Sequence, residues 1–126
     1  MASFVEVERV ARFALGGRKE SGLMRFMISA RCPNEKLNAL LKEGRFPEVF
    51  QSIMEELQPE AAYFTDVEGA RGAYLVVNLE DASELASKTE PLFQGLDATV
   101  QINLVSTLED IQRAMPAFEH AAQKFG

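Results

Sequence analysis

The sequence of 126 residues predicts an α+β domain, in which a four-stranded antiparallel sheet carries helices on one face. Four segments alternate between apolar and polar residues with a period of two, which is typical of half-buried strands. Other segments repeat their apolar residues every three or four positions, as amphipathic helices do. The order strand, helices, strand, strand, helix, strand, helix is the split βαβ arrangement of ferredoxin-like domains. Right-handed crossovers then place the helices on one side of the sheet.

Composition limits the classes of protein to which the chain can belong. One domain is expected at this length, and an apolar content of 47% is ordinary for a globular protein. The formal net charge of -6 repels phosphate backbones and anionic lipid, so neither nucleic acid nor a membrane is an expected partner. The N-terminus has the features of neither a signal peptide nor a transit peptide, and the expected location is the cytoplasm.

The first 23 residues are predicted to be an N-terminal extension, made of a short helix and a linker. Ser3 and Glu6 have the spacing of a capping box, and a glycine-rich stretch follows the helical pattern. Met24 stands directly before the first strong strand, so the domain is expected to cover residues 24–126. The extension has three interpretations at this point: an upstream start, an expression leftover or a docking helix.

The first strand is expected over Met24–Arg31 and is followed by two helices. Pro33 suits the start of the first helix, and Gly44 ends it. The second helix starts near Pro47, and Pro59 enforces its end. The apolar stripe of this second helix has close to ideal spacing: Phe46, Val49, Phe50, Ile53, Met54 and Leu57.

The stretch "EAAYFTDVEGARGAYLVV" predicts a hairpin of two strands joined by a tight turn. With Gly69 and Ala70 as a two-residue turn, Thr65 lies opposite Tyr74, and Tyr63 lies opposite Val76. Cross-strand partners then share a face of the sheet, which agrees with the alternation of apolar and polar residues.

A helix, a strand and a last helix complete the chain. "LEDASELASKTEPLFQGL" predicts a helix with Asp81 as its candidate cap and a kink or loosened turn at Pro91. The fourth strand is expected over about residues 98–105. Thr107 opens the last helix with a capping-box pattern, and Pro116 is expected to bend it.

The two faces of the predicted sheet differ in chemistry. The purely apolar set is assigned to the helices: Phe26, Ile28, Phe64, Leu75, Val77, Val100, Ile102 and Leu104. The other set has no charge in its middle: Met27, Ser29, Tyr63, Thr65, Tyr74, Val76, Asn78, Gln101, Asn103 and Val105. An uncharged face with aromatic residues is typical of an interface or a lined cavity, and a second copy of the chain is the simplest partner for it. The alternative is a weakly polar face that is open to water.

This second face also supplies the candidate ligand-binding residues, because pockets combine apolar walls with a few fixed polar groups. The candidates are Met27, Ser29, Tyr63, Thr65, Tyr74, Asn78, Gln101 and Asn103. The alternative is that these side chains satisfy one another across a dimer interface.

The residues that most often carry catalysis are scarce. Cys32 is the single cysteine, and a partly buried thiol is favoured over a nucleophile because nothing near it in sequence would lower its pKa. His120 is the single histidine, and a solvated or interface position is favoured over a general base. One Cys and one His cannot complete a structural zinc site, so neither a metal nor a cofactor is expected.

The stretch "PEAAYFTDVEGARGAYLVVNLEDASELASKTEPLFQGLDATVQINLVSTLEDIQRA" resembles an uncharacterised bacterial family of short proteins in the dimeric α+β barrel superfamily. The resemblance covers residues 24–126 and implies ferredoxin-like subunits that pair through their sheets. The superfamily includes small monooxygenases, muconolactone-isomerase-like enzymes, haem-handling proteins and stress-response proteins. No catalytic motif of these groups matches here residue by residue, so the resemblance assigns no catalytic residue.

Three hypotheses for function follow. The first is a homodimeric α+β barrel protein that binds a small apolar ligand between its sheets. The second is a small-molecule enzyme of the cofactor-free monooxygenase or isomerase type. The third is a protein-interaction module that uses the N-terminal helix as its docking arm. The sequence leaves open whether the protein catalyses a reaction.

Overall fold

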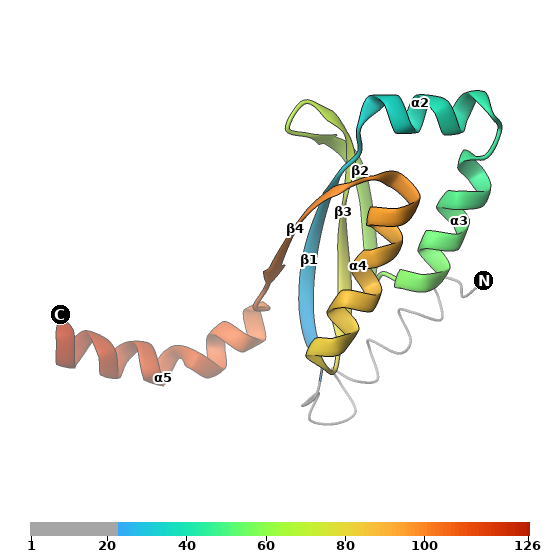
Figure 1. The fold of residues 1–126 in the computed structure, drawn as a ribbon. Coiled ribbons are helices and arrows are strands. Elements are labelled where there is room, and N and C mark those ends of the chain that lie inside the picture. Colours follow the sequence, from blue (N-terminus) through green and yellow to red (C-terminus); the bar gives the residue numbers. More distant parts are fainter. Residues whose placement is uncertain (1–22) are drawn as a thin grey trace.

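The computed structural model describes residues 23–126, so the predicted N-terminal helix and its cap at Ser3 lie outside the described residues. The described part of the chain is shown in Figure 1. Its elements are β1 (Met24–Arg31), α2 (Asn34–Lys42), α3 (Phe46–Leu57), β2 (Ala61–Val67), β3 (Ala70–Leu79), α4 (Ala82–Leu96), β4 (Thr99–Leu104) and α5 (Leu108–Phe125).

The four strands form one sheet in the order β2-β3-β1-β4, and every neighbouring pair is antiparallel. The predicted α+β class and four-stranded antiparallel sheet are therefore confirmed. The order of elements along the chain is consistent with the split βαβ arrangement. Figure 1 shows α3 and α4 on the same side of the sheet.

The core lies between this side of the sheet and the two helices. Ile28, Leu75 and Val77, which the alternation assigned to the helix side, are fully buried there. Phe64 and Leu104 belong to the same face but are 59% and 63% exposed. Both lie on the edge strands β2 and β4, whereas Ile28, Leu75 and Val77 lie on the central strands β1 and β3.

Close packing of the two helices depends on Gly95 in α4. A Cβ atom at this position would lie 3.1 Å from Cδ1 of Ile53 and 3.3 Å from Cγ1 of Val49, so only glycine lets α4 approach α3 this closely without adjustment. The carboxylate of Asp81 accepts a hydrogen bond from the backbone N–H of Ser83 at 2.8 Å, which confirms the predicted cap.

The hairpin turn differs from the prediction. Glu68 and Gly69 are its central residues, with φ angles of 49° and 83°, and Thr65 lies opposite Gly72. The expected turn at Gly69 and Ala70 was wrong, because a two-residue turn of this type needs positive φ at both central positions, and alanine disfavours it. The register changes by two residues, so each side chain keeps its predicted face.

The last helix also differs from the prediction that the helices share one face. Figure 1 shows α5 leaving the end of β4 and projecting away from the sheet, away from α3 and α4. None of its residues is buried. A four-stranded sheet is about 14 Å wide between its outer strand axes, so two helices of about 10 Å diameter already cover its helix side. The predicted capping box is confirmed, with mutual hydrogen bonds between Thr107 and Asp110.

The core assignment predicts a contrast between two leucines. Leu75→Ala removes a fully buried side chain and should lower the free energy of unfolding by about 2–5 kcal/mol. Leu41→Ala makes the same chemical change on an exposed site and should cost less than about 0.5 kcal/mol. Urea denaturation measures both, and equal effects would contradict the assigned core.

Candidate functional site

The side of the sheet opposite α3 and α4, which we call the open face, carries two uncharged rows. The first row across the strands is Tyr63, Tyr74, Ser29 and Gln101. The second row is Ala61, Val76, Met27 and Asn103. Met27, Tyr63 and Tyr74 are exposed in the single chain. The centre of the open face is therefore uncharged, as the alternation of the sequence indicated.

Five of the eight candidate ligand-binding residues come together on this face: Met27, Ser29, Tyr74, Gln101 and Asn103. With Val67 and Glu68 they line a hollow of about 120 Å³. Sites for small molecules usually measure about 300–1,000 Å³, so the hollow needs a second surface over it to enclose a ligand.

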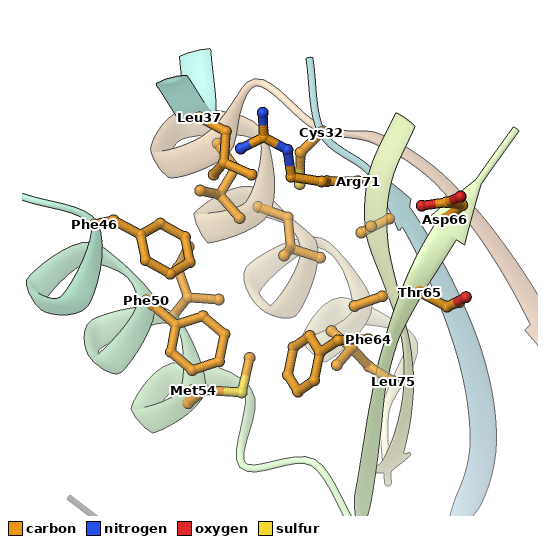
Figure 2. Close-up of a pocket in the computed structure, with 16 residues that line it drawn as sticks. Cys32, Leu37, Phe46, Phe50, Met54, Phe64, Thr65, Asp66, Arg71 and Leu75 are labelled. Atoms are coloured by element: carbon orange, nitrogen blue, oxygen red, sulfur yellow. The ribbon is translucent and has the colours of Figure 1, made fainter. Parts of the chain in front are cut away.

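The other three candidates lie outside this hollow. Tyr63 lies beside it, opposite Tyr74 in the register of β2 and β3. Thr65 borders a different cavity, and Figure 2 shows its hydroxyl group pointing away from α3. The side-chain amide of Asn78 donates a hydrogen bond to Oε1 of Glu60 at 2.9 Å, which engages it in a polar cluster at the end of the sheet.

This cluster is an ion pair that the sequence analysis missed. Arg25 donates from Nε to Oε1 of Glu60 at 2.8 Å and from Nη2 to Oε2 at 3.1 Å. The two side chains are only 15% and 26% exposed. The pair is bidentate and joins β1 to the residue before β2, so its role is to hold the strands together. Only the strand register, which brings Arg25 beside Asn78, could have revealed the Arg25–Glu60 ion pair in advance.

A larger cavity, which we call the helix-side cavity, lies between α3 and the strands β2 and β3 (Figure 2). Its volume is about 460 Å³. Phe46, Phe50 and Met54 line it from α3, and Phe64 lines it from β2. The rings of Phe50 and Phe64 are in contact, with centroids 5.5 Å apart and ring planes tilted by 57°. The walls are therefore mainly apolar and aromatic.

Two small residues leave the room for the helix-side cavity. Ala30 of β1 and Ala73 of β3 lie opposite each other on the helix side, and both border the cavity. In the next pair on the same face, Ile28 and Leu75 fill the corresponding volume with large side chains. Either alanine alone is unremarkable in the sequence, and the cavity depends on their meeting across the strands.

The rim of the cavity near α2 carries Arg71 and Cys32. Nη2 of Arg71 donates a hydrogen bond to Oδ1 of Asn38 at 2.6 Å, which connects β3 to α2. Burial raises the pKa of the Cys32 thiol above its ordinary value of 9.0, and the positive charge of Arg71 opposes this rise. A raised pKa disfavours the thiolate, so Cys32 is poorly suited to be a nucleophile.

The described residues offer no alternative catalytic or metal centre. Within residues 23–126, no group of three or more His, Cys, Asp and Glu side chains is placed to hold a metal ion. His120 is exposed on α5, outside the residues that line either hollow. No helix within the same range has the length and apolar character needed to cross a bilayer.

Comparison of the chain with models of known families, with curated proteins and with solved structures found no match. The dimeric α+β barrel superfamily, and the bacterial family within it, therefore stay predictions. The function must be argued from the geometry of the two faces.

The raised pKa predicts slow chemistry at Cys32. At pH 8 the folded protein should react with iodoacetamide about tenfold more slowly than N-acetylcysteine, because little thiolate is present and the side chain is buried. The rate should increase as the pH rises toward the raised pKa. Urea-unfolded protein is the control and should react like the free thiol; equal rates before unfolding would refute the assignment.

The cluster at the end of the sheet predicts a difference between two glutamates. Glu60→Gln leaves the largely buried Arg25 without a counter-charge and should destabilise the protein by about 1–3 kcal/mol. Glu48→Gln removes an exposed carboxylate that lies 3.9 Å from Arg45, and it should have no measurable effect. Thermal and urea unfolding give the stability of each variant. Equal losses of stability in Glu60→Gln and Glu48→Gln would contradict a structural role for the cluster.

Proposed function

We propose that this protein is a homodimer that binds a small apolar molecule in the helix-side cavity. The observation that carries the proposal is the cavity itself, whose volume of about 460 Å³ falls in the usual range for small-molecule sites. The cavity is open to solvent beside Phe64, so a ligand can reach it without a change in the fold. A ligand there would cover Phe64, which is 59% exposed.

The aromatic walls support an apolar ligand over a polar one. Phe46 stacks on Phe50 with ring centroids 5.5 Å apart, and Phe50 in turn contacts Phe64, so the three rings form one continuous apolar wall. Removal of these rings from water would stabilise a complex by about 25 cal/mol for each Å² of apolar surface buried.

Two features on the other side of the molecule support the homodimer. The open face presents two uncharged rows, and α5 presents large apolar side chains that are 40–78% exposed: Leu108, Ile111, Met115, Phe118 and Phe125. A surface of this kind is typical of an interface.

The size of the two surfaces indicates that both take part. The open face measures about 20 by 20 Å from the strand spacing and rise, or roughly 400 Å² in projection. The 18 residues of α5 add a helix about 27 Å long and 10 Å wide. Together they approach the roughly 800 Å² per partner of a standard interface, which the open face alone does not reach.

The other hypotheses receive less support from the structure. The hollow of about 120 Å³ on the open face is smaller than the helix-side cavity, so we assign the candidate residues on that face to the dimer contact and not to a ligand between the sheets. The monooxygenase or isomerase hypothesis has less support, because the titratable side chains that line the helix-side cavity are Asp66, Arg71 and Cys32, and the raised pKa of Cys32 disfavours its thiolate. For a protein-interaction module, the docking arm expected at the N-terminus lies outside the described residues, and α5 is a described element with an exposed apolar stripe.

The homodimer predicts the effect of charged substitutions. Met27→Lys on the open face and Met115→Lys on α5 each place a charge in the proposed contact, and each should weaken dimerisation at least about tenfold. Gln123→Lys is the control on the polar side of α5 and should leave the dimer intact. Light scattering coupled to gel filtration gives the mass, and a native protein of single-chain mass would end the dimer proposal.

Filling the cavity tests the binding proposal. Ala73→Leu places a large side chain in the helix-side cavity and should weaken binding of the uncharged probe N-phenylnaphthylamine at least about tenfold. Ala86→Leu adds the same atoms on an exposed turn of α4 and should bind like the native protein. Circular dichroism checks the fold, and Phe64→Ala, which removes an edge wall, gives a second variant. Native binding by Ala73→Leu would contradict this site.

A further inference from the structure

The helix-side cavity has a cationic group at one end. Arg71 lies at the start of β3, and Figure 2 shows its side chain across the end of the cavity near Leu37 and Cys32. Phe46 and Phe50 come from α3 and Phe64 from β2, and Figure 2 shows Phe50 and Phe64 well below the Arg71 end of the cavity. The cavity therefore changes from charged to apolar along its length.

The neighbours of Arg71 fix its position without neutralising its charge. Its hydrogen bond at 2.6 Å goes to the neutral amide of Asn38. Among residues 23–126, the ion pairs within 4.0 Å involve Arg25, Arg45 and Arg113 and leave out Arg71. A guanidinium group has five N–H donors, so several remain for another acceptor.

The nearest acidic candidate does not provide that acceptor. Asp66 lies opposite Arg71 in the register of β2 and β3. Asp66 also lines the cavity, but within residues 23–126 its carboxylate makes no ion pair with Arg71 within 4.0 Å, and Figure 2 shows the Arg71 side chain extending over the cavity. The charge of Arg71 also opposes the rise in the pKa of Cys32, so its field reaches the thiol that lines the cavity.

The dimensions set the shape of the occupant. From Phe46 to Met54 the helix α3 advances about 12 Å, and this length is lined by apolar side chains. A molecule that fills the space needs an elongated apolar part beyond Arg71. At the Arg71 end it needs a planar anion that can accept two parallel N–H bonds, for which a carboxylate is the matching group.

We propose that the helix-side cavity binds an amphipathic carboxylate, with the carboxylate on Arg71 and the hydrocarbon against the aromatic wall that Phe46, Phe50 and Phe64 form. This inference rests on the proposed function and adds the chemical class of the ligand. Arg71 is a binding residue, and Asn38 is a residue that positions it.

The test compares decanoate with decanol, which has the same chain length and no charge. Titrations of the full-length protein by calorimetry should give at least about tenfold tighter binding of decanoate, because a charge-assisted hydrogen bond is stronger than a neutral one. Arg71→Met should remove this preference and change decanol affinity less than about twofold. Arg71→Lys should keep part of it, since lysine retains the charge but not the fork of donors.

Two controls make the result specific. Arg113→Met removes an arginine from α5, which contributes no residue to the cavity lining, and should bind both compounds like the native protein. Decanoate should also slow alkylation of Cys32 further, because this thiol lines the same cavity. A titration with naphthoate in place of decanoate shows whether the site binds aromatic carboxylates as well as aliphatic ones.

The outcomes distinguish this inference from the proposed function. Equal binding of decanoate and decanol, unchanged in Arg71→Met, would overturn the carboxylate contact and leave the apolar site standing. Binding of neither compound, together with no binding of N-phenylnaphthylamine, would refute both. Nuclear Overhauser contacts from Phe50 to residues 1–22, or to α5 of a second copy, in the ligand-free dimer would show a protein segment as the occupant and overturn the proposal.

Discussion

The packing of α3 and α4 on the central strands β1 and β3 is the contact on which the rest of the molecule depends. Gly95 lets the two helices approach closely, so together they cover the middle of the sheet and leave its edges less covered. Phe64 and Leu104 are consequently exposed, a cavity opens beside β2, and α5 finds no room on that side.

Local patterns in the sequence were enough to predict the helices and strands, the faces of the strands and the caps at Asp81 and Thr107. Each of these features depends on residues that are only a few positions apart in the chain. The sequence was insufficient wherever distant residues meet. The helix-side cavity needs Ala30 beside Ala73, and the polar cluster needs Arg25 beside Glu60. Both depend on strand register, and the hairpin register was itself predicted two residues away from its true value.

Arg25 and Arg71 show how neighbours decide what an arginine does. Arg25 is held by both carboxylate oxygens of Glu60, so its charge is compensated within the fold. Arg71 is held by the neutral amide of Asn38 and keeps its charge at the edge of an apolar space. The first arrangement favours stability, and the second favours recognition of an anion. Residue type alone could not have separated them.

The start of α5 has a consequence for the dimer proposed above. A free helix of 18 residues is only marginally stable in water, but the mutual hydrogen bonds of Thr107 and Asp110 satisfy its first donors. The backbone N–H of Thr107 also keeps the pKa of the Asp110 carboxyl below its usual range, so the cap remains ionised in mildly acidic solution. In the proposed dimer, a helix whose first turn is already capped would lose less backbone freedom on association than an uncapped one.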